Sequence, residues 1–276
     1  MNTTSGGSPP LIERLRAGAR SIELDGVTYW RVEGDLLLDA GQLEAYAREQ
    51  ERIEATLAEA RRAGRPLVAT AEIDSLHEGG RIVRWAPGLE LTYCVLRRSF
   101  LTGGDRGYRL VVDCLRQACE DWEATCGVRF RHLTEHDHAT DRPAEVLFTV
   151  REFDARGIVV AAAFFPNDPV DRRQVQVDPM FYALDETTFD RVGVMRHELG
   201  HVLGFRHEQI SSGAPKGCPD EPTYGKIDLT LYDPRSVMHY FCAGGGTHEL
   251  KITDLDREGA QRVYGPPWTS FRFVDR

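Results

Sequence analysis

The chain has 276 residues, a hydrophobic content of 41% and a formal net charge of −9 at pH 7. This length is enough for one large globular domain, alone or with a smaller module. The acidic balance argues against nucleic acid as a partner, and no stretch approaches the roughly 18 apolar residues that a membrane helix needs.

The N-terminal part of the chain is expected to begin with a flexible lead and to continue into strands. Residues 1–20 form the expected lead, and no secretory signal is expected there because they contain no apolar core with a cleavage site. Strands are predicted from Ser21 to Leu38, with Asp25 and Gly26 as a hairpin turn. This stretch therefore predicts a small β-structure near the N-terminus.

A helix is predicted next, from Ala40 to Arg62. Its start matches a capping box, in which Asp39 and Gln42 would bond to each other's backbone. Its larger apolar residues recur at helical spacing. We interpret residues 1–79 as an N-terminal module and residues 80–276 as the main domain.

The main domain is predicted to combine strands with helices. Strands are expected at Leu89–Leu96, Val128–Leu133, Glu145–Val150, Ile158–Phe165 and Gln174–Val177. Helices are expected at Tyr108–Ala124, from Thr187 or Thr188 onward, and at Thr253–Tyr264. Thr253 and Gly265 fit the start and the end of the last helix. This mixture predicts an α+β fold.

The segment HELGHVLGFRHE carries the most specific motif of the chain. His197 and His201 lie one helical turn apart and share a face that can bind one ion, with Glu198 beside them. Gly204 lies where the helix would stop and turn, because glycine tolerates positive φ, and the turn would return His207 as a third ligand. Three neutral imidazoles leave Zn²⁺ one open position, which is typical of a catalytic site. The alternative, solvated histidines on a surface helix, does not account for these fixed offsets.

A second segment, Ser236–Tyr240, follows in a loop-like region and reads SVMHY. The extended zinc motif followed by a methionine turn resembles the signature of the metzincin zinc endopeptidases. Within that clan the chain is most similar to the astacin family, because Glu208 directly follows the third histidine and SVMHY matches the astacin form of the turn. The resemblance implies that Tyr240 is a fifth zinc ligand that swings away to support the transition state. It also implies that Met238 packs beneath the zinc without binding it.

The same resemblance implies a fold and a reaction. Residues 80–276 would form a twisted mixed sheet with a backing helix, an active-site helix and a C-terminal helix. Zinc lowers the pKa of bound water to about 7, Glu198 would act as general base and then as general acid, and Tyr240 would donate a hydrogen bond to the oxyanion. The expected reaction is hydrolysis of internal peptide bonds in a protein or peptide substrate. A zinc-binding module without catalysis, which has no need of Glu198 as a base, and a hydrolase of non-protein amides remain as alternatives.

The predicted strand Ile158–Phe165 has two interpretations. Metzincins bind a peptide as an added antiparallel strand at a sheet edge, and the three alanines at residues 161–163 would let a substrate backbone approach closely. In the other interpretation, the strand is buried and the alanines are small because of packing. The sequence leaves both open.

The N-terminal module contains a candidate inhibitory residue. Astacins are kept inactive by an aspartate within a Phe-x-Gly-Asp motif, and Val32–Asp35 reads VEGD, which keeps Gly-Asp and lacks the phenylalanine. Asp35 would then bind the zinc in place of water. The alternative is an ordinary turn, because Gly-Asp suits turns generally. No cysteine precedes Cys94, so a cysteine switch in this module is not expected.

The cysteine content permits disulfides. The six cysteines are Cys94, Cys114, Cys119, Cys126, Cys218 and Cys242, and they allow 15 pairings. Cys218 and Cys242 bracket the segment that leads to the methionine turn, so a bridge there would brace the site. Reduced thiols in the core are the alternative.

The resemblance also has an implication for localisation. It favours secretion, because the family is mostly secreted.

A second histidine-rich stretch lies at His132, His136 and His138, with Asp137 and Asp141 nearby. Related matrixins carry a structural zinc in a loop of similar composition, but the spacing here does not match that pattern well. A solvated polar loop is therefore the preferred interpretation, because short His-rich tracts are only a compositional indication.

Overall fold

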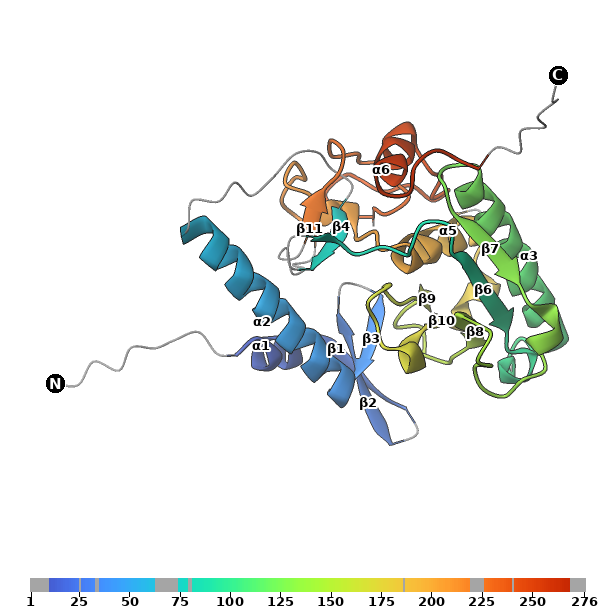
Figure 1. Cartoon of the computed structure of the whole chain (residues 1–276). Coiled ribbons are helices and arrows are strands. Elements are labelled where there is room, and N and C mark those ends of the chain that lie inside the picture. The colour runs from blue at the N-terminus through green and yellow to red at the C-terminus, as the bar shows by residue number, and fades with distance from the viewer. Residues whose placement is uncertain are drawn as a thin grey trace, which may run out of the picture.

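The computed structural model describes residues 10–24, 26–32, 35–62, 74–78, 81–185, 187–218, 226–239 and 241–268. Within these ranges, a small N-terminal module lies beside a larger part that carries the histidine motif (Figure 1). The fold is α+β, as the sequence predicts. No helix in the described ranges is long and apolar enough to cross a membrane.

The module begins with a short helix, α1 (Leu11–Gly18), where the sequence predicted a flexible lead. That prediction was wrong for the described part of the lead. The helix presents Leu11, Ile12 and Leu15 to the module, where Leu11 is buried and the other two pack against its apolar cluster. An amphipathic stripe of this kind stabilises even a short helix through tertiary packing.

A three-stranded antiparallel sheet follows α1. Its strands are β1 (Arg20–Leu24), β2 (Val27–Val32) and β3 (Leu36–Asp39), in the order β1-β2-β3. Gly26 has a φ of +77°, as expected for a hairpin turn, whereas Asp25 lies outside the described residues. The predicted strands of the module are therefore confirmed.

Helix α2 (Ala40–Arg62) has the bounds that the sequence predicts. Its first turn is closed by the predicted capping box. The Asp39 amide donates to Gln42 Oε1 at 2.7 Å, and the Gln42 amide donates to Asp39 Oδ1 at 2.8 Å. Together with β3, this helix fixes the position of the turn that carries Asp35.

The larger part is built on a five-stranded mixed sheet with the order β7-β6-β8-β10-β9. Its strands are β6 (Glu90–Val95), β7 (Arg129–His132), β8 (Phe148–Glu152), β9 (Ala161–Ala162) and β10 (Gln174–Val177). Strands β7, β6, β8 and β10 run parallel to their neighbours, and only β9 is antiparallel. Strand β9 therefore forms one edge of the sheet.

Two of the predicted strands differ from the observed ones. The strand predicted at Glu145–Val150 is shifted toward its C-terminus, and the one predicted at Ile158–Phe165 shrinks to β9. Turns close both ends of that second segment: the Ile158 amide donates to the Ala155 carbonyl at 3.1 Å, and the Phe165 amide donates to Asp168 Oδ2 at 2.7 Å. The apolar run could not reveal these turns.

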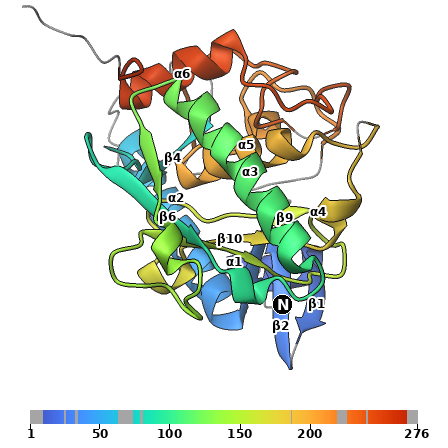
Figure 2. The ribbon, with the colours of Figure 1, turned by 90° about the vertical axis from the view of Figure 1, so that its right-hand side faces the viewer.

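Helices cover one face of this sheet. Helix α3 (Gly104–Glu123) and helix α5 (Arg191–Val202) lie side by side (Figure 2). Helix α3 buries a stripe formed by Val111, Leu115, Ala118 and Trp122. The Trp122 indole donates to the Arg196 carbonyl at 2.9 Å, which ties α3 to the centre of α5. The sheet, α3 and α5 enclose the main apolar core.

The remaining helices are short or C-terminal. Helix α4 covers Met180–Ala183, α6 covers Asp254–Tyr264, and four 3-10 turns cover Arg97–Ser99, Thr134–His136, Val170–Arg172 and Glu208–Ile210. Thr253 is the N-cap of helix α6 and Gly265 is its C-cap, as predicted.

Helix α5 begins later than the sequence predicts. The expected start was Thr187 or Thr188, but the N-cap is Asp190, whose Oδ1 accepts a hydrogen bond from the Gly193 amide at 2.6 Å. Thr187 and Thr188 instead bond to Asp185 in a separate turn. An aspartate is an equally good N-cap, so the local sequence offered several starting points.

A third, small sheet connects distant segments. Its order is β11-β4-β5, with β4 at Asp74–Glu78, β5 at Arg81–Ile82 and β11 at Lys226–Asp228. The antiparallel pairing of β4 with β11 joins residues 74–78 to the C-terminal half. The division of the chain at residue 79 stays a proposal, and this pairing favours a boundary before Asp74.

Candidate metal centre

Helix α5 places two histidines of the motif on its buried side. His197 and His201 are 4% and 3% exposed, and their Nε2 atoms lie 3.2 Å apart. His197 Nδ1 lies 2.8 Å from the Val237 carbonyl, and His201 Nδ1 lies 2.8 Å from the Phe205 carbonyl. Since a carbonyl can only accept, each Nδ1 must carry the proton, which leaves each Nε2 with a lone pair directed into the site.

A glycine ends the helix and returns the third histidine. Gly204 has a φ of +94°, and a Cβ at this position would lie 2.7 Å from the Val83 carbonyl oxygen. Both facts require glycine there. The turn brings His207 Nε2 to 3.1 Å from His201 Nε2, with the His207 side chain fully buried. The structure therefore brings together the three histidines that the sequence singles out.

The N-terminal module supplies a fourth ligand atom. Asp35 lies in the turn before β3, and its Oδ2 is 3.2 Å from His197 Nε2, 3.3 Å from His201 Nε2 and 3.2 Å from His207 Nε2. The four ligand atoms all lie within 4.8 Å of one another. Burial favours protonation of Asp35, but the facing histidines outweigh it and lower the pKa of this carboxyl well below its usual range. The carboxyl is therefore ionised.

The donor set fits a divalent cation. Burial lowers the pKa of His197, with Asp35 acting in the opposite direction, so the imidazole is neutral. The carboxylate of Asp35 and the Nε2 lone pairs of His197 and His201 are all acceptors, and acceptors that face one another in a buried site repel unless a cation lies between them. Neutral imidazole nitrogens with one carboxylate oxygen form a usual tetrahedral ligand set for zinc.

Glu198 lies beside this cluster and is buried. Its side chain is 3% exposed, and its Oε2 has no hydrogen-bond partner among the described residues. Burial raises the pKa of Glu198 well above its ordinary value, the charge of Asp35 raises it further, and His207 acts in the opposite direction. A carboxyl with a raised pKa and an open oxygen is suited to exchanging protons with a reactant.

The methionine turn packs directly beneath the helix. Met238 is fully buried, and a Cβ added to Gly200 would lie 2.3 Å from its sulfur atom. Gly200 therefore permits the close approach of the turn to α5, a role that we did not predict from the sequence. Glycine inside a predicted helix was the available signal, because it destabilises a helix unless close packing requires it.

Asp256 of α6 holds the methionine turn and was also missed. Its carboxylate accepts hydrogen bonds from Ser236 Oγ at 2.6 Å, the Val237 amide at 2.9 Å and the Thr253 amide at 2.8 Å. The carbonyl of Val237 is the acceptor for His197 Nδ1. Asp256 thus fixes the orientation of the His197 imidazole through Val237. The capping pattern at Thr253 gave no indication of this longer-range role.

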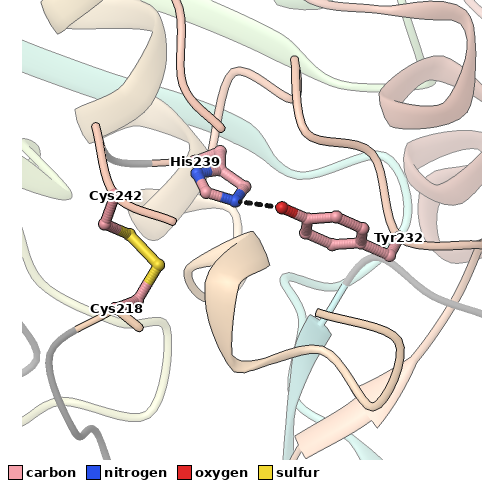
Figure 3. The surroundings of a disulfide bond; sticks show 4 residues. All are labelled: Cys218, Tyr232, His239 and Cys242. Carbon is pink, nitrogen blue, oxygen red and sulfur yellow. Dashed lines mark hydrogen bonds between the residues drawn. A yellow bond between two sulfur atoms is a disulfide. The ribbon is translucent and has the colours of Figure 1, made fainter. Parts of the chain in front are cut away.

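A disulfide braces the segment after the methionine turn (Figure 3). Cys218 and Cys242 are bonded, as one of the two interpretations expected, and the other four cysteines are buried free thiols. Close by, His239 Nε2 and the Tyr232 hydroxyl lie 2.8 Å apart (Figure 3). Tyr240 lies outside the described residues, so its expected role as a zinc ligand stays a prediction.

In the histidine-rich stretch near His132, the polar side chains hold the fold together. The buried carboxylate of Asp137 accepts from the Val95 amide at 2.8 Å and from the Tyr108 hydroxyl at 2.5 Å, and it lies 2.9 Å from His132 Nε2. Its oxygens are thus used in holding β6 and α3 together. Among the described residues, the group around Asp35 is the only cluster of three or more potential metal ligands, so the second metal site gains no support.

Comparison with known proteins shows similarity over the segment that carries the motif. Residues 84–214 match the family model described as Matrixin. A protein of Heliothis virescens ascovirus 3e, described as "Putative matrix metalloproteinase", is 26% identical over 170 residues, which are 55% of this chain and 34% of that protein. The match therefore spans about a third of the viral relative.

Solved structures give weaker likenesses. Myroilysin matches with a TM-score of 0.44 and 15% identity, over 66% of this chain and 95% of that chain. High choriolytic enzyme 1, a hatching-enzyme zinc-protease from Oryzias latipes, matches with a TM-score of 0.41 and 15% identity, over 66% of this chain and 94% of that chain. At these scores the likeness carries no functional inference.

Proposed function

We propose that this chain is a zinc-dependent endopeptidase of the metzincin kind that is kept latent by Asp35, and the match of residues 84–214 to the Matrixin family model supports this proposal. The observation that carries the proposal is the convergence of three buried imidazole nitrogens and one carboxylate oxygen within 4.8 Å. In this proposal, His197, His201 and His207 hold the metal throughout. Asp35 occupies the coordination position that a catalytic site keeps open for water or substrate.

The proposed chemistry assigns one task to each group. When bound, zinc supplies an activated water and polarises the scissile carbonyl. Glu198 takes the proton from the attacking water at Oε2, the oxygen that has no hydrogen-bond partner among the described residues, and later delivers it to the leaving amine. The backbone carbonyls of Val237 and Phe205 hold the imidazoles in the tautomer that binds metal. Tyr240 would donate to the oxyanion, as the astacin resemblance implies.

Removal of Asp35 is the proposed activating event. The module positions this carboxylate over the histidines and, at the same time, excludes a substrate from the zinc. Displacement of the module would free the ligand position that Asp35 occupies and would let a substrate reach the metal. Protein or peptide is the proposed substrate, since a metzincin cleft takes an extended chain at a sheet edge.

The test is hydrolysis of casein by the full chain and by its Asp35→Ala variant, each with and without the chelator 1,10-phenanthroline. We expect chelator-sensitive cleavage that is much faster for the variant. Equal rates for the two proteins would remove latency and keep the peptidase. Bound zinc without cleavage by either form would point instead to a non-catalytic zinc module or to a hydrolase of other amides.

A further inference from the structure

The main sheet has one face toward the helices and one face toward the module. Val150 and Val175 belong to the core that the helices cover. Side chains alternate along a strand, so Arg151 and Gln176 point to the opposite face. Gln176 pairs with Arg151 in β8 and with Ala162 in β9, which places these three residues in one row across the sheet.

The module packs on this face without filling all the space over it. Leu37 packs with Ala162, and Tyr29 packs edge-on against Phe153 with ring centroids 5.5 Å apart. The same four residues border a cavity of about 220 Å³, which is several times the ~30 Å³ that one water occupies in the liquid. Both parts of the chain supply its polar walls, with Asp39 and Gln42 from the module and Arg151, Gln174 and Gln176 from the main domain.

Arg151 is the group in this cavity that needs a partner. Its side chain is half-buried, and its Nε is buried with no hydrogen-bond partner among the described residues. A guanidinium is always charged, and a charged donor that is buried without an acceptor is costly. The cavity beside Arg151 has room for an acceptor that the described residues do not provide.

The carboxylates around the cavity have other roles. Asp39 Oδ1 accepts from the Gln42 amide at 2.8 Å, and Asp168 Oδ2 accepts from the Phe165 amide at 2.7 Å. Asp171 is exposed. These three carboxylates give the cavity a negative side, which repels an anion more strongly as its charge increases.

We propose that this cavity binds a small polar monocarboxylate, which pairs with Arg151 and holds the module against the main domain. The effect on latency rests on the proposed function. A carboxylate matches the planar guanidinium, and its single charge limits repulsion by the three aspartates. The amides of Gln174 and Gln176 can donate to the uncharged part of such a ligand or accept from it.

The position of the cavity links binding to latency. Because its walls come from both parts of the chain, the complete site exists only while the module is docked. A ligand that binds one of two states shifts the equilibrium toward that state. At a concentration of about ten times Kd, the undocked fraction falls by about 10-fold, and the basal peptide hydrolysis of the full chain falls with it.

The experiment adds N-acetylglycine, a small carboxylate with one amide, to the zinc-loaded full chain. Its uncharged counterpart, N-acetylglycinamide, is the matched control ligand. By titration calorimetry we expect N-acetylglycine to bind at least about 10-fold more tightly than the uncharged amide. Phosphate at the same ionic strength should bind more weakly than N-acetylglycine. At about ten times Kd, N-acetylglycine should raise the Tm by about 2–4 °C.

Variants of Arg151 locate the binding. Arg151→Gln should weaken N-acetylglycine binding by about 10-fold or more and should remove its effect on hydrolysis. Arg151→Lys keeps the charge without the planar fork and should retain part of the affinity, so it also serves if Arg151→Gln does not fold. Arg106→Gln, at an exposed position of α3 outside the cavity, should bind N-acetylglycine as the parent does.

The results that would overturn the inference differ from those that would overturn the proposed function. Equal binding of the two ligands, no binding of either, or unchanged affinity in Arg151→Gln would remove the site. Binding that leaves basal hydrolysis unchanged would remove its link to latency. Absence of hydrolysis by every form would overturn the proposed function alone, because calorimetry measures binding without catalysis.

Discussion

The metal centre joins two regions that are held in place by different interactions. His197, His201 and His207 come from one continuous segment of the main domain. Asp35 reaches His197 from a module 162 residues away in the sequence. The four ligand atoms are similarly close to one another, but the two regions are held by interactions that differ in how easily they can be broken.

The histidine segment is fixed mainly by backbone groups. Backbone carbonyls accept from His197 and His201, Gly204 makes a turn that other residues tolerate poorly, and Met238 packs against the helix without a gap. Every one of these interactions belongs to the folded core of the main domain. They cannot be lost without local unfolding of the domain.

The module is held mainly by side chains. Val32, Leu36, Leu38 and Leu43 pack with Phe165 of the main domain, and Leu37 packs in a separate cluster with Ala155, Val159 and Ala162. Phe165 also packs edge-on against His201, with ring centroids 5.4 Å apart. Such contacts can be released as a unit while each part keeps its own backbone hydrogen bonds. The comparison teaches that the fixed region suits a permanent ligand set and the releasable region suits an inhibitor.

The largest expected effect comes from the fixed region. Glu198→Gln keeps the size of the side chain and removes its ability to accept and return a proton. We expect peptide hydrolysis by the activated chain to fall by about 10²- to 10⁴-fold, with zinc content unchanged when measured by atomic emission. Glu120→Gln, at an exposed residue paired with Arg116, is the matched control. Substantial peptidase activity in Glu198→Gln would remove the assigned base.

A smaller effect of opposite sign is expected from the releasable region. Asp35→Ala removes the carboxylate from the metal centre, and a hydrogen bond to a charged group contributes about 1.5–3 kcal/mol. We expect the basal hydrolysis of the full chain to rise by about 10- to 100-fold, measured with a quenched fluorescent peptide. Asp105→Ala, an exposed carboxylate paired with Arg97, should leave the rate unchanged. If Asp35→Ala hydrolyses the peptide as slowly as the parent chain, Asp35 is not an inhibitor, and the module has only a structural role.

The same contrast separates what the sequence could predict from what it could not. The ligand segment is local, so spacing alone indicated the helix, the turn at Gly204 and the three histidines. The bounds of α2 were also predictable, because the capping residues Asp39 and Gln42 lie next to each other in the chain. In such cases the interactions that fix the structure span only a few residues.

Longer-range contacts were beyond the sequence. The pairing of β4 with β11 and the packing of Leu37 against the main domain depend on segments that are far apart in the chain. The strand predicted at Ile158–Phe165 failed for a related reason, because side-chain and backbone turns at its ends override the apolar pattern. Asp35 was recognised only through a family motif, and no periodicity would have brought it to the histidines.

Asp256 offers a third test, at the outer support of the fixed region. Asp256→Ala leaves Ser236 Oγ and the Val237 amide without their acceptor and loosens the carbonyl that orients His197. We expect zinc affinity to fall by about 10-fold, as for other residues that orient metal ligands, together with a lower Tm. Asp254→Ala, at an exposed position in the first turn of the same helix, is the control. Unchanged zinc affinity would show that the methionine turn holds its position without α6.

The smallest expected effect on hydrolysis concerns the disulfide. Replacing Cys218 and Cys242 together by serine opens a loop with a sequence separation of 24, and a loop of this size corresponds to about 2–4 kcal/mol of stability. We expect a lower Tm by calorimetry and a change in kcat/KM of less than about 10-fold, because the bridge braces the segment after the methionine turn and lies outside the segment from His197 to His207. A phosphine reductant, which binds zinc less than thiols do, should lower the Tm of the parent chain to that of the double variant and leave the variant unchanged. Equal Tm values before reduction would mean that the turn at Met238 is held by Asp256 alone, and the fixed region would then depend entirely on its buried hydrogen bonds.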